Sequence, residues 1–146
     1  MPSSSLAVEA KIANISVITD YIDATLPNID KQTKTRMYIA ADEVFSNIVR
    51  HGRLSESATV NVGIAVDKNN AAITFTDCGV VFNPLKQADL YTAPSSADDD
   101  VHGLGAFVLV QIADCVEYRR HGNTNILTIT FALTHYNSIM KLETPF

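Results

Sequence analysis

Three polar side chains recur at every fourth position of the stretch 40–52, AADEVFSNIVRHG, namely Glu43, Asn47 and His51. On an α-helix, residues four apart lie one above another on the same side. A carboxylate in such a row can act as a general base, and an amide oxygen is a ligand that Mg²⁺ accepts together with phosphate oxygens. The row is equally typical of the solvated face of an amphipathic helix, so both interpretations stay open.

A second candidate is the segment Asp77-Cys78-Gly79, which ends a predicted strand and is followed by Phe82. A carboxylate accepts hydrogen bonds only, so Asp77 could bind an exocyclic amine such as that of adenine. The alternative is structural, because Asp-x-Gly is a common turn sequence.

A third candidate is Gly103-Leu104-Gly105, which opens an apolar helix predicted over 106–113. The free N–H groups and the dipole of a helix start favour an anion such as phosphate, and glycine lets that anion approach the backbone. A flexible entry into the helix is the alternative. Val108 stands where a dinucleotide fingerprint needs its third glycine, and the chain has no GxxxxGK[ST] sequence.

The elements that must position these residues follow from hydrophobic periodicity and turn signals. Asp30 is expected to cap the second helix, and Gly52 is expected at its C′ position. Because the strands come in hairpin pairs, we expect an α/β (α+β) fold, a two-layer sandwich of a mixed, mostly antiparallel sheet with helices on one face. The expected ranges are an edge strand at 4–10, helices at 11–26 and 31–51, strands at 59–66 and 71–76, a short helical piece at 85–90, a helix at 106–113, and strands at 116–120 and 126–133.

Composition and net charge limit the kinds of molecule that the chain is expected to bind. The chain has 146 residues, which suits one domain, and a formal net charge of -5 with no basic cluster beyond Arg119-Arg120. We therefore expect no nucleic-acid partner. No signal-peptide pattern opens the chain and no apolar run approaches the roughly 20 residues of a membrane span, so we expect a cytoplasmic protein that does not bind a membrane. Cys78 and Cys115 are expected to be reduced, small buried residues.

Together, E-x-x-x-N-x-x-x-H, D-x-G-x-x-F and G-x-G resemble the N, G1 and G2 boxes of the GHKL ATP-binding superfamily, whose fold is of the Bergerat type. The stretches AADEVFSNIVRHG and HGLGAFVLVQIADCVEY look most like the anti-sigma factor serine/threonine kinases. The resemblance covers about residues 6–133. It implies a single ATPase/kinase domain over 1–146, with a lid over the nucleotide at about 85–102.

The resemblance also implies roles for individual residues. Glu43 matches the catalytic general base, Asn47 the ligand of Mg²⁺, and Asp77 the residue that binds the adenine amine. Thr128 is our candidate for the threonine that often supports the adenine-binding aspartate. ATP and Mg²⁺ are the implied cofactors, and the implied binding residues are Asn47, His51, Asp77, Gly79, Phe82, Gly103, Leu104, Gly105 and Thr128.

The implied function is phosphorylation of a serine or threonine on an anti-sigma-factor antagonist, with a sigma factor as the alternative partner. A homodimer is left open. Many relatives carry a basic residue in the lid just before G-x-G, where this chain has Asp98-Asp99-Asp100. Carboxylates beside a triphosphate would repel it. The acidic lid therefore favours a second hypothesis, an ATP-binding or partner-binding regulatory switch (an anti-sigma factor) with little or no kinase activity.

Overall fold

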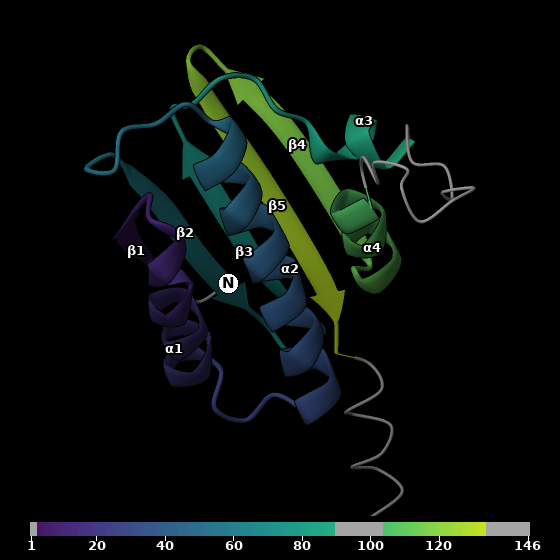
Figure 1. Cartoon of the computed structure of the whole chain (residues 1–146). Helices are drawn as coiled ribbons and strands as arrows, with labels where there is room; N and C mark the ends of the chain where they lie inside the picture. The colour runs from purple at the N-terminus through teal and green to yellow at the C-terminus, as the bar shows by residue number, and fades with distance from the viewer. Residues whose placement is uncertain (1–2, 90–103, 134–146) are drawn as a thin grey trace, which may run out of the picture.

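The computed structural model describes residues 3–89 and 104–133. In this part of the chain, helices cover one face of a five-stranded sheet (Figure 1). The elements in chain order are β1 (Ser3–Glu9), a 3₁₀ turn η1 (Ile12–Asn14), α1 (Ile15–Thr25), α2 (Lys31–His51), β2 (Thr59–Val66), β3 (Asn70–Asp77), α3 (Pro84–Asp89), α4 (Leu104–Ile112), β4 (Cys115–His121) and β5 (Thr124–Ala132).

The strands lie in the order β1-β2-β3-β5-β4, and every pairing in the described sheet is antiparallel. The predicted sandwich is confirmed, with β1 at an edge as expected. β5 lies beside β3, although α3, α4 and β4 separate the two strands in the sequence. The end of β3 therefore meets the start of β5, and Asp77 pairs directly with Asn125.

The core lies between the sheet and the helices that cross it. Residues alternate along each central strand between the buried face and the open face, as period-two geometry requires. Phe75 on β3 and Phe131 on β5 are fully buried against Phe45 of α2. The buried apolar residues of the core include Val60, Val62, Ile64, Ile73, Leu127 and Ile129 from the sheet, and Ile18, Ile22, Met37, Val44 and Leu109 from the helices.

The long helix α2 begins as the sequence predicts. The carboxylate of Asp30 accepts a hydrogen bond from the backbone N–H of Thr33 at 3.0 Å and so caps the helix. Burial opposes ionisation of this carboxyl, but the hydrogen bonds from Thr33 and the charge of Arg36 outweigh it, so the pKa of Asp30 lies below its ordinary value.

The end of α2 differs from the prediction. Gly52 is the C-cap residue with a right-handed backbone (φ -73°), and Arg53 after it takes the left-handed conformation (φ 55°). Gly52 serves close packing instead. Its carbonyl accepts a hydrogen bond from Val80 N–H at 3.1 Å, and a Cβ on Gly79 would lie 2.7 Å from that carbonyl oxygen. Two glycines thus let the end of α2 touch the connection after β3.

Several boundaries move by a few residues. The helix predicted over 11–26 starts with the 3₁₀ turn η1, and α4 starts at Leu104, so Gly105 lies inside the helix. The short helical piece near 85–90 is confirmed as α3. β5 starts at Thr124, two residues before the predicted strand.

None of the helices within 3–89 and 104–133 has the length and hydropathy that a membrane span needs.

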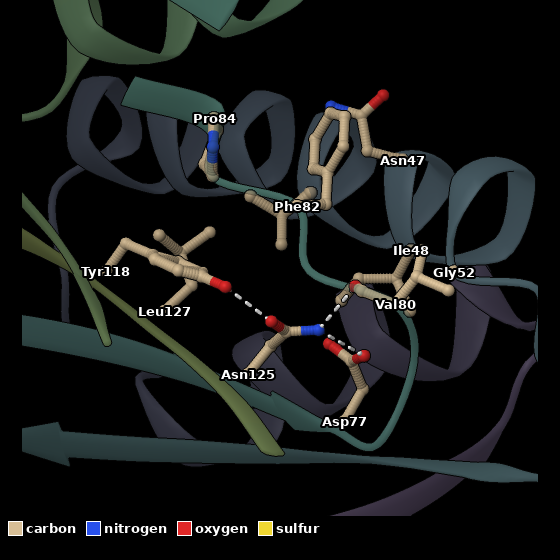
Figure 2. A pocket seen from close by; sticks show the side chains of 11 residues that line it. Asn47, Ile48, Gly52, Asp77, Val80, Phe82, Pro84, Tyr118, Asn125 and Leu127 are labelled. Carbon is tan, nitrogen blue, oxygen red and sulfur yellow. Dashed lines mark hydrogen bonds between the residues drawn. The ribbon is translucent and has the colours of Figure 1, made fainter. Parts of the chain in front are cut away.

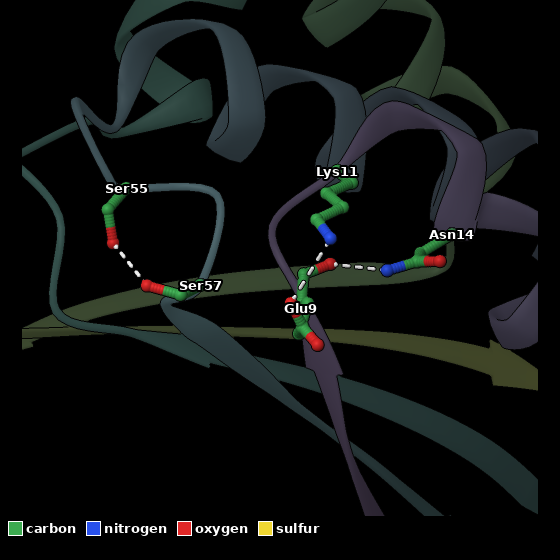
Figure 3. Close-up of polar contacts among 5 residues, drawn as sticks. All are labelled: Glu9, Lys11, Asn14, Ser55 and Ser57. Carbon is green, nitrogen blue, oxygen red and sulfur yellow. Dashed lines mark hydrogen bonds and ion pairs between the residues drawn. The ribbon is translucent and has the colours of Figure 1, made fainter.

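Polar contacts fix the chain where it leaves the edge strand (Figure 3). Asn14 donates from its side chain to the Glu9 carbonyl at 3.0 Å, and Lys11 forms an ion pair with the Glu9 carboxylate at 3.4 Å. In the neighbouring loop, the hydroxyls of Ser55 and Ser57 are 3.2 Å apart. The Ala10 N–H donates to the Ala58 carbonyl at 2.8 Å and so joins the turn between β1 and α1 to the loop that follows α2.

Both cysteines are exposed, so the expectation that they are buried is wrong. Cys115 pairs with Thr130 at the edge strand β4, on the sheet face away from the helices. The Cys78 Sγ lies 3.8 Å from the Thr124 hydroxyl oxygen, just after β3 ends. The alternation of the strands decides this placement, because it turns these positions away from the core.

The cap of α2 provides a test of the fold. Replacing Asp30 by Ala should lower the free energy of unfolding by about 1 kcal/mol at neutral pH, since an N–H in the first turn loses its acceptor. Because the pKa of Asp30 is lowered in the folded protein, its ionised form stabilises the fold above about pH 4, and this advantage disappears as the pH falls further. Urea unfolding at several pH values measures both effects.

The matched control is Asp30→Asn, which keeps an acceptor at the N-cap and should lose only a few tenths of a kcal/mol. Equal stability of the Ala variant and the wild type at pH 7 would contradict the role of Asp30.

Candidate functional site

A pocket opens where α2, the end of β3 and the β4–β5 hairpin meet (Figure 2). Its walls combine apolar side chains with a small number of polar groups, which is the usual composition of a small-molecule site. The lining residues are Val44, Asn47, Ile48, Gly52, Asp77, Val80, Phe82, Pro84, Tyr118, Asn125 and Leu127.

Asp77 supplies a carboxylate to this pocket. The residue is only 6% exposed, and its Oδ1 accepts hydrogen bonds from Gly79 N–H at 2.8 Å and from the Asn125 side chain at 3.1 Å. Within the described residues, no hydrogen bond is formed by its second oxygen, Oδ2. Since a carboxylate only accepts, the pocket offers a hydrogen-bond acceptor to a ligand that carries a donor.

Asn125 is the site residue that sequence reasoning missed. Its Nδ2 group donates to Asp77 and to the Val80 carbonyl at 2.9 Å, and its Oδ1 accepts from Tyr118 and Arg120. The prediction placed Asn125 in a turn, but β5 already includes it. The available signal was its alternation with the buried apolar residues of β5, which places it on the same face.

Thr128 does not reach Asp77, so that part of the prediction is wrong. Its neighbours in β5, Leu127 and Ile129, point to the buried face, and Thr128 therefore points to the other face of the sheet. There its hydroxyl oxygen lies 3.2 Å from that of Thr74. Asn125, which pairs directly with Asp77, occupies the position that Thr128 was expected to fill.

Glu43 and Asn47 are hydrogen-bonded along one side of α2, and Asn47 lines the pocket. The Asn47 Nδ2 group donates to Glu43 Oε1 at 2.7 Å, and both residues are half-buried. Because the amide nitrogen faces Glu43 in this bond, the amide oxygen faces away from that carboxylate. An amide oxygen is a hard ligand of the kind that Mg²⁺ prefers.

The described residues contain no group of three or more His, Cys, Asp or Glu side chains that could hold a metal ion. A Mg²⁺ ion at Asn47 would therefore share its coordination with oxygens of a bound ligand, which is how Mg²⁺ commonly binds beside phosphates.

Gly105 in the first turn of α4 lies directly against Glu43. A Cβ at Gly105 would overlap the carboxylate end of the Glu43 side chain, so Glu43 would have to move if this glycine were replaced. Leu104 is the first residue of α4 and is exposed. Gly103 lies outside the described residues.

His51 and Phe82 bring the end of α2 together with the connection that follows β3. Their rings are stacked, with centroids 5.3 Å apart and an interplanar angle of 10°. Phe82 also lines the pocket, so this stack holds one wall in place.

A family model described as a histidine kinase-like ATPase domain matches residues 8–131, which is most of the chain. The chain belongs to this family. The match includes α2, the end of β3 and α4, the elements that carry the predicted site residues. The expected GHKL superfamily is thereby confirmed.

Solved structures show the same fold at low sequence identity. A structure of the RsbU and RsbW domains of Rv1364c from Mycobacterium tuberculosis is 15% identical, with a TM-score of 0.64 over 91% of this chain. The chain spans 33% of that structure. The histidine kinase domain of a blue-light activated kinase from Erythrobacter litoralis is 16% identical, with a TM-score of 0.52 over 92% of this chain and 65% of its own. No curated protein matches the chain at a significant level.

In this histidine kinase-like ATPase domain, the predicted lid over 85–102 is described only in its first part. Residues 85–89 belong to α3, which contacts α4 and β4. The remainder, including Asp98-Asp99-Asp100, lies outside the described residues.

The contact between Gly105 of α4 and Glu43 of α2 can be tested by the effect of Gly105→Ala on the stability of the domain. Gly→Ala inside an unhindered helix stabilises a protein by up to about 1 kcal/mol. Gly105→Ala should give little or none of this gain, because the new methyl group displaces the Glu43 carboxylate from its hydrogen bond with Asn47. Thermal or urea unfolding measures the difference.

Glu43→Ala in the same chain should recover most of the gain, since it removes the displaced carboxylate. Gly63→Ala is the control, because the nearest atom to its added Cβ is 3.6 Å away. A Gly105→Ala variant about 1 kcal/mol more stable than the wild type would refute the close contact.

Proposed function

We propose that this domain is an ATP-dependent serine/threonine protein kinase of the anti-sigma factor type, which phosphorylates an anti-sigma-factor antagonist. The observation that carries the proposal is the arrangement of one pocket. The buried Asp77 carboxylate lies at one side of it, with an oxygen that no donor among the described residues reaches. Asn47 lines the pocket from α2 and is hydrogen-bonded to Glu43 one turn earlier on that helix.

The Asp77 carboxylate would bind the base. Its Oδ1 is occupied by Gly79 and Asn125, which leaves Oδ2 to accept from the exocyclic amine of adenine. A base with a carbonyl oxygen at the same position would place two acceptors against each other. Apolar residues beside Asp77, among them Val80 and Leu127, would pack against the purine ring.

Asn47 and Glu43 would act at the phosphate end. Asn47 would hold Mg²⁺, which when bound neutralises charge on the phosphates. Glu43 would accept the proton of the attacking serine or threonine hydroxyl while the new O–P bond forms and ADP leaves with the electrons of the broken β,γ-bridging bond. The Asn47 amide, donating to Oε1, orients the Glu43 carboxylate for that transfer.

The proposed partner rests on the resemblance of 40–52 and 102–118 to the anti-sigma factor kinases. The fold shared with a structure that includes an RsbW domain is consistent with it. A sigma factor is the other candidate partner. Cytoplasmic location remains an expectation from the sequence, which shows no signal-peptide pattern and no long apolar run, and a homodimer is left open.

The second candidate function is a nucleotide-binding or partner-binding switch with little or no kinase activity. One observation favours it: among the described residues that line the pocket there is no lysine or arginine to neutralise a triphosphate. The acidic segment 98–100 adds negative charge to the sequence of the expected lid. Such a protein would bind ATP through Asp77 but would leave Glu43 without a substrate hydroxyl.

Nucleotide binding can be tested at Asp77. Asp77→Asn should weaken ATP binding at least tenfold, because an amide that keeps its oxygen toward Gly79 and Asn125 presents an N–H donor to the adenine amine. Titration calorimetry with Mg²⁺ and ATP measures the loss.

Asp67→Asn is the matched control, since it makes the same chemical change in the β2–β3 turn at the far end of β3. Equal affinity in Asp77→Asn and the wild type, or no binding in either, would refute the assigned site.

Kinase activity can be tested at Glu43. Glu43→Gln keeps the acceptor for Asn47 and should leave ATP affinity within about threefold, while phosphotransfer falls by about 10²–10⁴ because the proton acceptor is lost. The readouts are transfer of labelled phosphate to the antagonist encoded nearest to its gene, and ATP hydrolysis.

The control is Asp42→Asn, the neighbouring exposed carboxylate on α2. Undiminished transfer by Glu43→Gln would exclude Glu43 as the base. Tight ATP binding by the wild type with no transfer would favour the switch.

A further inference from the structure

We propose that Tyr118, Arg120 and Asn125 form a positioning relay that sets the base selectivity of the pocket by fixing one orientation of the Asp77 carboxylate. Asn125 occupies the position expected for the supporting threonine, whereas Tyr118 and Arg120 lie outside the three sequence motifs described above. The inference rests on the proposed function, because it concerns how the same pocket recognises the base of a nucleotide.

The relay is built into the register of three neighbouring strands. Asp77 at the end of β3 pairs with Asn125 on β5, and Asn125 pairs with Arg120 on β4. Directly paired residues on one face of a sheet have side chains within reach of each other. The row therefore places a carboxylate, an amide and a guanidinium side by side at the end of the sheet that forms the pocket.

The hydrogen bonds allow only one orientation of the Asn125 amide. Its oxygen faces two donors, the Tyr118 hydroxyl at 2.5 Å and Arg120 Nη1 at 3.1 Å. Its nitrogen faces acceptors only, Asp77 Oδ1 at 3.1 Å and the Val80 carbonyl at 2.9 Å. A rotated amide would oppose donors to donors and acceptors to acceptors, and the residue is 6% exposed, so water could not replace the lost bonds.

Arg120 also ties the relay to the connection after β3. Its Nη1 donates to the Gly79 carbonyl at 2.8 Å, and its Nε donates to the Gly122 carbonyl at 3.0 Å. A cationic donor on the amide oxygen polarises the amide and strengthens the donation from its nitrogen. The positive charge of Arg120 thus strengthens the hydrogen bond that Asn125 donates to Asp77.

The consequence for Asp77 is that its two oxygens are not equivalent. Oδ1 is held by Asn125 and by Gly79 N–H, so Oδ2 alone is left for the ligand. A ligand that donates there meets an acceptor already in place and loses little entropy in ordering it. With the relay weakened, the carboxylate can turn, and part of the preference for an amino-substituted base is lost.

Tyr118→Phe is the sharpest variant, because it removes one hydroxyl and keeps the ring that lines the pocket. The probes are ADP and the diphosphate of purine riboside, which lacks the 6-amino group and is otherwise the same ligand. The wild type should prefer ADP. Tyr118→Phe should bind ADP about five- to tenfold more weakly and should bind the deamino probe within about twofold of the wild type.

Tyr21→Phe is the control, because it makes the same chemical change at a tyrosine of α1, far from the pocket. It should leave the affinities for both probes unchanged. Arg120→Met is a second variant, which keeps the aliphatic stem and removes the guanidinium whose Nη1 donates to the amide oxygen. It should reduce the preference for ADP in the same direction. Thermal unfolding establishes that each variant is folded at the temperature of the titration.

The outcomes separate the two proposals. If the wild type binds neither probe, the proposed nucleotide site and the relay both fail. If the wild type prefers ADP and both variants keep the full preference, the relay is refuted while the site stands. If the variants lose affinity for both probes equally, the residues act on the fold alone, which also refutes the relay.

Discussion

The site depends on a buried hydrogen bond between the Asp77 carboxylate and the Asn125 amide. A carboxylate that is almost fully buried is stable only where donors replace the water it has lost. Gly79 N–H and the Asn125 side chain supply those donors, and both come from chain segments that fold correctly only when β3 and β5 are paired. The same contact therefore joins the centre of the sheet to the chemistry of the pocket.

The local sequence pattern predicted those site residues whose positions depend on one helix or one strand alone. Glu43 and Asn47 lie four residues apart on one helix, and helical geometry alone brings them together. Asp77 follows an alternating strand and caps its end. The expected sandwich was likewise confirmed, because hairpin signals and amphipathic helices leave few other arrangements.

The parts that failed depend on where a strand begins or on how two elements approach. Asn125 is missed because the start of β5 is predicted two residues too late, and Thr128 fails because its place between Leu127 and Ile129 turns it to the other face of the sheet. The packing of Gly105 on Glu43 depends on the tertiary position of α4, which periodicity does not encode. The exposure of Cys115 follows from the alternation of an edge strand, whereas the general tendency of cysteine to be buried pointed the other way.

The turn between β4 and β5 limits the changes in loop length that this fold tolerates. It consists of Gly122 and Asn123, and Gly122 takes a positive φ of 61°. Inserting one residue here, unless a longer loop or a bulge absorbed it, would shift the register of β5 and turn Phe131 out of the core and Asn125 out of the pocket together. Foldability and ligand recognition therefore both depend on a turn that keeps this register.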